Sequence, residues 1–456
     1  MDYVVEQEKK IPVKSYDVVV VGGGTTGVVA ALASARNGAK TALIEAKGYP
    51  GGIVVEGGTA LHSFYNMWKA FPGVEKRQVI KGIPQEIIDR LMAYGGCSGH
   101  AEMLKGYDYD SVCTAIDTEI YKLVAFELLE ESGVDLFMNT LLTSAINEGG
   151  KITGIITESR SGREIFKAKC FIDSTGYGDV CALAGAQFTE INDHPVVNSM
   201  GVGGVSIEGF MAYGKEHGLL NQYSNGIRSG EPDQLVRVDL SASKLPEALR
   251  REVKDMGLAL VVTSVHDDYF MFVKINYKMD INPTDRNAVS KAEIELRKRQ
   301  RKAIEFIRKH IPGCEKAFIA RTSPALTIRR ARCIKCDYDV TLDDIVEARH
   351  FEDDVFVYSF HDCGAKYQVK DGGTYGMPYK SLCVSGIDNL YATGMMITSG
   401  WEAHMSTRNT VNCMAQGQAV GTAAALCSKS EIGTRDLSYG VLKDTLVKDG
   451  VYFDEG

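Results

Sequence analysis

Residues 16–35 read YDVVVVGGGTTGVVAALASA, and this stretch decides the fold. Apart from Asp17, its first six residues are apolar or aromatic, which predicts a buried parallel strand, and the small residues at its end predict a helix. Gly22, Gly24 and Gly27 fit the spacing G-x-G-x-x-G. In this spacing the first glycine allows a tight turn, the second lets a pyrophosphate approach the backbone, and the third lets the helix pack closely on the strand.

An acidic residue follows the next predicted strand, which spans residues 40–44. Glu45 lies 18 residues beyond Gly27, where a carboxylate binds ribose hydroxyls in dinucleotide-binding units. Thr25 and Thr26 open the predicted helix, whose N-terminal N–H groups and positive dipole end favour phosphates. The whole unit predicts a bound dinucleotide, and the alternative is a tight turn without a ligand.

Three later stretches repeat the theme of glycines beside apolar segments. They are KGYPGG at 47–52, CFIDSTGYGDVCALAGA at 170–186, and a long stretch over 386–426 that begins GIDNLYATG. The last two each place Thr-Gly after an apolar strand and before a helix of small residues. Strands from distant parts of the chain that return to one glycine-rich site indicate a long, bent dinucleotide.

These motifs resemble those of a known family. The chain resembles bacterial FAD-dependent oxidoreductases related to the fumarate reductase and succinate dehydrogenase flavoproteins. The stretches that carry the resemblance are VVVVGGGTTG with Glu45, IDSTGYGDV, PALTIRRARCIKCDYDVTLDDI, GMPYKSL, DNLYATG and CMAQGQAVGTAAA. The resemblance covers about residues 15–185 and 300–450. It implies a Rossmann-like FAD-binding domain of the glutathione reductase and fumarate reductase type, with FAD held non-covalently.

The resemblance also implies where FAD is bound. It places the pyrophosphate at Gly22, Gly24 and Gly27, the adenosine ribose at Glu45, the adenine at the backbone near Leu142, the cofactor path at Gly51 and Gly52, the ADP half at Thr175, Gly176 and Asp179, and the ribitol at Gly394. Met395 follows Gly394 where many flavoproteins have Asp and close relatives often have Arg. A helix over about 410–426 would point its N-terminus at the flavin pyrimidine edge, where reduced flavin is negative.

The segment EAHMSTRN places His404 and Arg408 in H-x-x-x-R spacing just before that helix. Fumarate reductases have a similar pair that helps to hold a substrate carboxylate. A guanidinium suits a carboxylate by its geometry and permanent charge, and a histidine can move a proton near neutral pH. The alternative is a local structural role, with Arg408 bonded to carbonyls or to FAD.

Three further residues are candidates for proton transfer or hydroxyl binding. His361 lies in SFHDCG, before the glycine-rich stretch that contains Tyr379, and it matches a histidine frequent in the family. Pro378 would fix the approach of Tyr379. His62, in TALHSFYN, is a weaker candidate. For each of them a structural role is the alternative.

The motif TIRRARCIKC contains two more pairs to consider. Arg329 and Arg332 could anchor an anionic substrate or brace the substrate domain. Cys333 and Cys336 form C-x-x-C, but DYDVTLDDI after them reads as a strand and a turn, without the helix of a thioredoxin-like dithiol or a second cysteine pair for a metal. We therefore expect no metal site.

An amphipathic helix is predicted over 291–310, with Ile294, Ala303, Ile304 and Ile307 on its apolar face. The chain has 456 residues, a net charge of −8 and 11 cysteines. The acidic total argues against a nucleic-acid partner. The polar opening residues and the lack of a long apolar run predict a cytoplasmic protein with reduced thiols and no membrane partner.

We expect a discontinuous FAD domain, residues 1–190 and 375–456, and an inserted α+β substrate or cap domain over 191–374. The predicted function is hydride transfer between flavin N5 and a carbon of a small polar substrate, with reduction of an unsaturated acid or ketone favoured. The first alternative is a dehydrogenase of a sugar or hydroxy compound. The others are a flavin electron-transfer subunit and an RNA-modifying flavoprotein. No second G-x-G-x-x-G follows a strand in the cap, so a separate electron donor or acceptor is expected.

Overall fold

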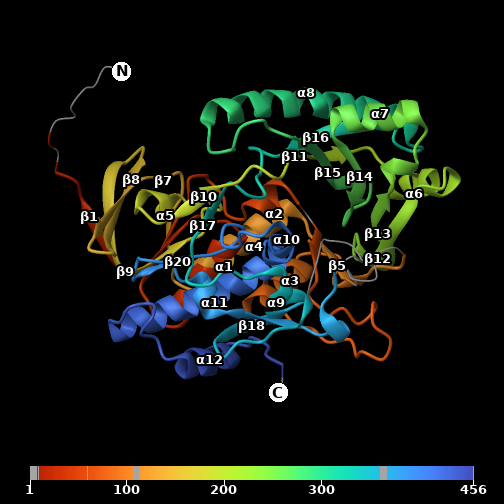
Figure 1. Cartoon of the computed structure of the whole chain (residues 1–456). Helices are drawn as coiled ribbons and strands as arrows, with labels where there is room; N and C mark the ends of the chain where they lie inside the picture. Colours follow the sequence, from red (N-terminus) through yellow and green to blue (C-terminus); the bar gives the residue numbers. More distant parts are fainter. Residues whose placement is uncertain (1–7, 9, 59, 106–111, 360–366, 455–456) are drawn as a thin grey trace.

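The computed structural model describes residue 8 and residues 10–58, 60–105, 112–359 and 367–454. Buried apolar side chains form two large clusters. The first surrounds a mainly parallel sheet, and the second belongs to an antiparallel sheet in the upper right of Figure 1. The architecture is the predicted one, a Rossmann-like α/β domain that carries an inserted α+β cap.

Seven strands form the first sheet, in the order β6-β2-β1-β9-β8-β7, with β20 paired to β9 as well. Val21, the last residue of β1, pairs in parallel register with both Ile44 and Asp173, and Ala392 also pairs with Asp173. The carboxyl ends of four strands therefore meet at one edge, where such sheets bind ligands. The strands are β1 (Val13–Val21), β2 (Thr41–Ile44), β6 (Asp135–Phe137), β7 (Leu141–Glu148), β8 (Lys151–Ser159), β9 (Gly162–Asp173) and β20 (Leu390–Ala392).

Two helices pack closely against each other beside this sheet, α1 (Thr25–Arg36) and α11 (Thr410–Ser430). A Cβ on Gly417 would lie 2.4 Å from the carbonyl oxygen of Thr26, and a Cβ on Gly421 would lie 2.2 Å from that of Ala30. The glycines of α11 thus let the two backbones touch. Since α11 is buried over most of its length, this explains why it is rich in small residues without an apolar stripe.

The remaining elements of the first domain are mostly short. The helices are α2 (Ile53–Glu56), α3 (Ile83–Ala93), α4 (Thr118–Glu131), α5 (Asp179–Leu183), α9 (Leu342–Val346), α10 (Trp401–Thr407) and α12 (Tyr439–Lys448). The strands β3 (Ala60–His62), β4 (Ala101–Glu102) and β5 (Val112–Ala115) form a small sheet, and β18 (Asp354–Tyr358) pairs with β19 (Tyr375–Pro378). Among the described residues, no helix combines the length and apolar character needed to cross a bilayer.

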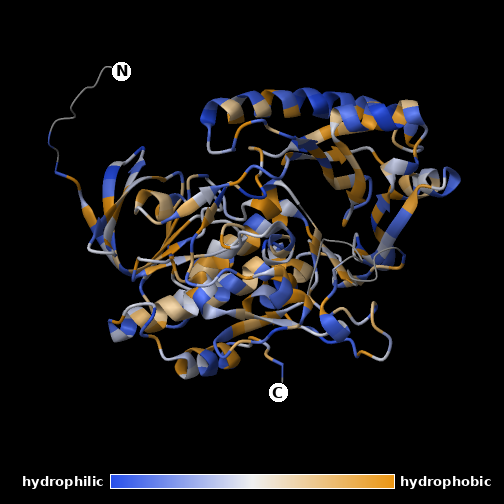
Figure 2. Ribbon diagram, viewed as in Figure 1, coloured by the Kyte–Doolittle hydropathy of each residue, from blue (hydrophilic) through white to orange (hydrophobic). Residues whose placement is uncertain are grey.

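The cap is a six-stranded antiparallel sheet in the order β12-β13-β14-β15-β11-β16. Helices α7 and α8 run along its upper side in Figure 1, and Figure 2 shows their outward faces to be largely hydrophilic. The strands are β11 (Val196–Gly203), β12 (Leu220–Arg228), β13 (Glu231–Leu240), β14 (Leu258–Thr263), β15 (Tyr269–Tyr277) and β16 (Phe318–Thr322), and the helices are α6 (Ile207–Glu216), α7 (Glu247–Met256) and α8 (Arg286–His310).

The predicted amphipathic helix is part of α8, but one residue was assigned to the wrong face. Ala303, Ile304 and Ile307 are buried as expected, whereas Ile294 is 59% exposed. The buried face continues toward the N-terminus through Leu296 and Ala292 instead. Ile294 lies two residues from each of them, about 200° around the helix, so it points to solvent.

One other local prediction was wrong. The segment 337–345 was read as a strand and a turn, but it contains α9. Thr341 and Asp344 form a capping box at the start of that helix, a signal that the sequence reading overlooked.

The chain passes from the second apolar cluster to the first between Ala331 and Ile334. Cap residues enter the second cluster as far as Ala331, while Ile334 and later buried residues belong to the first. The crossing is made by β10 (Phe188–Glu190) and β17 (Arg332–Ile334), which pair with each other. The chain therefore enters and leaves the cap through one two-stranded ribbon.

Candidate active site

A cavity of about 280 Å³ lies at the edge where the strands end. Its walls come from the glycine turn after β1, the end of β2, the turn after β9, the cap residues Leu326 to Ile328, and the start of α11. Most of the residues that sequence reasoning assigned to FAD line it, namely Gly22, Gly24, Thr25, Thr26, Glu45, Gly52, Leu142, Thr175, Gly176, Asp179 and Gly394. Segments far apart in the sequence thus converge on one site.

Gly27 and Gly51 do not line the cavity, but they shape its walls. A Cβ on Gly27 would lie 1.8 Å from the carbonyl oxygen of Gly22, so only glycine lets α1 start this close to the strand. Gly51 has a φ of +118°, and its N–H donates to the carbonyl oxygen of Gly23 at 2.8 Å. Its own carbonyl accepts from the hydroxyl of Thr25 at 3.0 Å.

Glu45 is held in place by backbone donors. Its carboxylate accepts hydrogen bonds from the N–H groups of Gly23, at 2.6 Å, and Lys47, at 2.8 Å. Burial raises the pKa of Glu45, and these two hydrogen bonds oppose the rise. The carboxylate is therefore pre-oriented at the cavity wall, as a ribose-binding residue requires.

The turn after β9 is organised by Asp173, which sequence reasoning did not single out. Asp173 is fully buried, and its carboxylate accepts from the N–H and the hydroxyl of Thr175 and from the N–H of Cys181. Burial raises the pKa of Asp173. The network ties the turn to α5 and fixes Ser174, Thr175 and Gly176 along the cavity.

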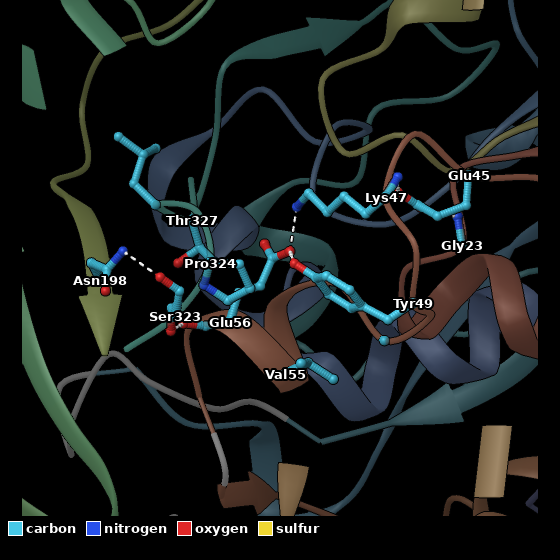
Figure 3. A network of polar contacts seen from close by, with 12 residues as sticks. Gly23, Glu45, Lys47, Tyr49, Val55, Glu56, Asn198, Ser323, Pro324 and Thr327 are labelled. Atoms are coloured by element: carbon cyan, nitrogen blue, oxygen red, sulfur yellow. Dashed lines mark hydrogen bonds and ion pairs between the residues drawn. The ribbon is translucent and has the colours of Figure 1, made fainter. Parts of the chain in front are cut away.

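Figure 3 shows a second network that the sequence did not reveal. Glu56, at the end of α2, is buried and lines the cavity together with Lys47 and Tyr49. Its carboxylate pairs with the Lys47 ammonium and accepts from the Tyr49 hydroxyl at 2.6 Å. Its carbonyl accepts from the hydroxyl of Ser323, a cap residue. The one signal for Glu56 was its place four residues after Gly52.

The first turn of α11 forms another wall, through Thr410 and Cys413. Asn409 caps the helix, since its side chain accepts from the N–H of Val411 at 3.0 Å. One turn further along, Gln416 accepts from the N–H of Gly394 at 2.6 Å. This contact ties the Thr393-Gly394 turn to α11. The N–H of Gly394 is thus bonded to a protein side chain.

Arg408 and His404 are placed very differently. Arg408 lines the cavity between α10 and α11. His404 is fully buried, and its Nε2 lies 2.9 Å from the carbonyl oxygen of Met395. Burial lowers the pKa of His404 well below its usual value, and the charges of Arg330 and Arg408 lower it further. His404 is thus a neutral residue that donates to Met395 and holds the turn, and it has no surface in the cavity.

The other proton-transfer candidates do not meet at the cavity. The Tyr379 hydroxyl is buried elsewhere, 2.6 Å from that of Tyr391 and 2.7 Å from the carbonyl oxygen of Thr434. The prediction for Tyr379 was therefore wrong in position, because the Pro378 signal concerned the backbone and not the direction of the side chain. His62 lies on β3 and does not line the cavity. His361 lies outside the described residues.

The arginine and cysteine motifs have structural surroundings. Arg332 donates to the carboxylate of Asp179 at 2.8 Å and to the carbonyl oxygen of Tyr177 at 3.0 Å, so it braces the cavity wall from behind. Cys333 and Cys336 are buried. Burial raises the pKa of Cys333 to about 11 and that of Cys336 well above its usual value, so both are thiols at neutral pH. Within the described part of the chain, no cluster of metal-ligating side chains occurs.

The walls of the cavity fit a dinucleotide. A Cβ on Gly52 would lie 2.9 Å from the Cα of Gly24, so glycine is needed at position 52, whereas a Cβ on Gly24 would meet only the Cα of Gly52, at 4.0 Å, which leaves space for a ligand beside Gly24. Ser174 also lines the cavity, and its hydroxyl is buried without a hydrogen-bond partner. An unpartnered buried hydroxyl is uncommon in folded proteins and occurs here in a residue of the cavity wall.

Comparison with known proteins agrees with this site. Residues 17–446 match the family model described as FAD dependent oxidoreductase. The chain belongs to this family. It is therefore an FAD-dependent oxidoreductase, and FAD is the dinucleotide that the glycine turns predicted. The finer relation to the fumarate reductase flavoproteins stays a prediction, because the family that matches is broader.

Individual relatives are distant. A dihydrolipoyl dehydrogenase from Acholeplasma laidlawii is 33% identical over 128 residues, which cover 27% of this chain and 32% of that protein. A thiamine thiazole synthase from Pyrococcus horikoshii is 28% identical over 173 residues, covering 36% of this chain and 58% of that protein. The matches thus span about a third to somewhat over half of these relatives.

One solved structure shares the fold over most of both chains. It is a geranylgeranyl bacteriochlorophyll reductase-like protein from Thermoplasma acidophilum, with a TM-score of 0.50 and 15% identity, covering 96% of this oxidoreductase and 83% of that chain. At this level of identity the likeness concerns the fold alone.

Proposed function

We propose that this FAD-dependent oxidoreductase transfers a hydride between the flavin and a carbon of a small substrate that carries an anionic oxygen group. Bound FAD supplies the hydride chemistry. The observation that carries the proposal is Arg408, a permanent cation in the wall of the cofactor cavity. A guanidinium at this place suits a carboxylate by charge and by its fork of donors.

The surroundings of Arg408 support an anionic substrate. Arg330 is buried near it, with its side chain only 2% exposed, and its guanidinium donates to the carbonyl oxygen of Ser399. Both cations lower the pKa of His404, and of the two Arg408 is the one that lines the cavity. Asp193, 3.6 Å from Arg330, is the acidic partner there. A site with two arginines and one carboxylate attracts anions.

The proposed FAD contacts follow the cavity. Gly22, Gly24 and Gly52 would lie against the pyrophosphate, and Glu45 would bind the adenosine ribose. The first turn of α11 would face the flavin ring with its N–H groups, which favour negative charge on the reduced ring. Reduction of an unsaturated acid or ketone and oxidation of a hydroxy compound use these groups in opposite directions, and we favour reduction.

The test begins with purified protein and its flavin absorption. The protein is then screened, under anaerobic conditions, with enoates, keto acids, hydroxy acids and sugars as oxidants or reductants of the flavin. We expect an anionic compound to react, and Arg408→Ala to lower its kcat/KM by about 100-fold with FAD content unchanged, the loss of a charge-assisted contact in a closed site.

Arg301→Ala is the matched control, because Arg301 lies on α8 with 83% of its side chain exposed. It should leave kcat/KM unchanged. An Arg408→Ala variant that keeps wild-type kcat/KM on an anionic substrate would contradict the proposal, and so would exclusive activity on uncharged sugars.

A further inference from the structure

A histidine from the cap lies beside α10 and was not singled out by the sequence. The His194 ring faces Trp401, with ring centroids 6.1 Å apart at 24°, and it meets the His404 ring edge-on at 5.3 Å. The His194 side chain is 5% exposed, while Trp401 is 44% exposed. His194 is thus enclosed between an indole that reaches solvent and the neutral, buried His404.

The hydrogen bonds of His194 define its tautomer. Its Nδ1 lies 2.6 Å from a carboxylate oxygen of Asp193, which can only accept, so Nδ1 carries a hydrogen. The other oxygen of Asp193 lies 3.6 Å from the Arg330 guanidinium, which holds the carboxylate in place. In the neutral imidazole, Nε2 therefore carries the lone pair. A carboxylate that fixes the tautomer in this way is how enzymes orient a histidine for proton transfer.

Nε2 of His194 and the guanidinium of Arg408 point at one atom. The sulfur of Met405 lies 3.4 Å from His194 Nε2 and 3.3 Å from Arg408 Nη2. A thioether is a weak acceptor on a flexible side chain. A substrate oxygen that takes the place of this sulfur would lie between the imidazole and a guanidinium that already lines the cofactor cavity.

We propose that His194, oriented by Asp193, is the catalytic residue that moves the proton at the substrate oxygen, and that the substrate is a hydroxy acid or the corresponding keto acid. The inference rests on the proposed function. Bound FAD would supply the hydride to the carbonyl carbon in reduction and take it up from the C–H bond in oxidation. His194 Nε2 would give a proton to the carbonyl oxygen in reduction and accept the hydroxyl proton in oxidation.

The charges around His194 set its protonation. Burial lowers the pKa of His194, Asp193 raises it, and Arg408 and Arg329 lower it. The groups that face the ring from every packed element are Asp193 on its own segment, Arg329 and Arg330 before β17, and Trp401, His404, Met405 and Arg408 on or next to α10. Binding of a carboxylate at Arg408 would offset the arginine charge, so the pKa of His194 should rise when an anion binds.

His404, the residue that the sequence favoured, cannot take this role. Its Nε2 is bonded to the Met395 carbonyl, which accepts and so fixes the hydrogen on Nε2. His404 and His194 are both buried and neither lines the cavity, so the difference between them lies in their ring nitrogens. His194, by contrast, has Nδ1 engaged by a carboxylate and Nε2 against a replaceable side chain.

The experiment uses the FAD-loaded protein with malonate as the probe, a non-reactive dicarboxylate. Binding is followed by the change in flavin absorption and by proton uptake, and the imidazoles are observed by NMR after labelling with ¹⁵N-histidine. We expect free His194 to be neutral at pH 7 with its hydrogen on Nδ1, and its pKa to rise when malonate binds.

His194→Gln should weaken malonate binding by about tenfold or more and abolish the proton uptake, as expected for a lost hydrogen bond to an anion. His217→Gln, at the exposed C-terminus of α6 in the cap, is the matched control and should leave both unchanged. Asp193→Asn should keep FAD bound but change the ¹⁵N signature of His194, because an amide can also donate to Nδ1.

The outcomes separate the two proposals. If malonate binds equally to wild type and to Arg408→Ala, the proposed function is overturned whatever His194 does. If Arg408→Ala loses binding but His194→Gln keeps both affinity and proton uptake, only the present inference fails. The inference also fails if His194 in the malonate-free protein carries its hydrogen on Nε2, or if malonate does not change the ¹⁵N signals of His194.

Discussion

Gly421→Ala should destabilise the protein although alanine is the better helix former. The new Cβ would lie 2.2 Å from the carbonyl oxygen of Ala30, while ordinary contact begins near 3.4 Å, so α11 and α1 would have to separate by roughly 1 Å. Both partners are backbone, which cannot rotate away. Overpacking of this kind costs about 1–3 kcal/mol, and helix propensity returns up to about 1 kcal/mol. We expect a net loss of roughly 1–2 kcal/mol.

The matched control is Gly440→Ala in the first turn of α12. Its Cβ would meet only the Ser438 hydroxyl, at 3.9 Å, so the same substitution should be neutral or stabilise by up to about 1 kcal/mol. Urea unfolding followed by far-UV circular dichroism measures both variants, and FAD retained after dialysis reports whether the first turn of α11 has moved. If Gly421→Ala unfolds at the same or higher urea concentration than wild type, the close approach of α1 and α11 is wrong.

Three further predictions concern the first domain and its contact with the cap. Glu45→Gln should raise the Kd for FAD by about tenfold or more, because the amide cannot accept hydrogen bonds from both Gly23 and Lys47 and also bind the ribose. Unchanged FAD affinity in a fluorescence titration would contradict the assignment of Glu45 to the ribose. His266→Gln should flatten the pH dependence of stability above pH 6. A hydrogen bond to Asp117 raises the pKa of His266, so the pair stabilises the folded protein fully below the usual histidine pKa of about 6.5. This stabilisation is lost as the pH rises through the raised pKa. If the melting temperatures of wild type and His266→Gln change in parallel with pH, the prediction is wrong. Asp117→Ala should cost about 1 kcal/mol or more in urea unfolding, since it removes the N-cap of α4 as well as that pair; a loss no larger than that of His266→Gln would show the cap to be unimportant.

The cofactor half of the site could be predicted from the sequence because its signals are local. At a position where any side chain would clash, such as Gly27 against the Gly22 carbonyl, the fold requires glycine, so the spacing of the glycines can be recognised in the sequence. Glu45 is fixed by its distance from the glycines along one βαβ unit. Parallel register then brings the later turns to the same edge, so Thr175 and Gly394 could be placed from their own Thr-Gly motifs.

The substrate half could not be predicted in the same way. Tyr379 and His404 follow motif signals, but a motif fixes the backbone and says little about where a side chain points. Tyr379 turns into the core toward Tyr391, and His404 toward the Met395 carbonyl. Glu56 had a weak signal in its distance from Gly52, and its role depends on Lys47 and on the cap residue Ser323, which no local pattern connects.

His194 shows why the proton-transfer group was the hardest to find. It lies in the segment between β10 and β11, more than 200 positions before Met405 and Arg408, and nothing in its neighbours marks it. Its chemistry arises only when the cap folds back on α10 and brings a carboxylate to one ring nitrogen and a cavity arginine near the other. The cap is attached through one ribbon, β10 with β17, and its residues Leu326 to Ile328 line the same cavity as the FAD turns. The family resemblance rests on those turns and identifies the cofactor, while in our proposal the substrate is selected where the cap residues Asp193 and His194 meet Arg408.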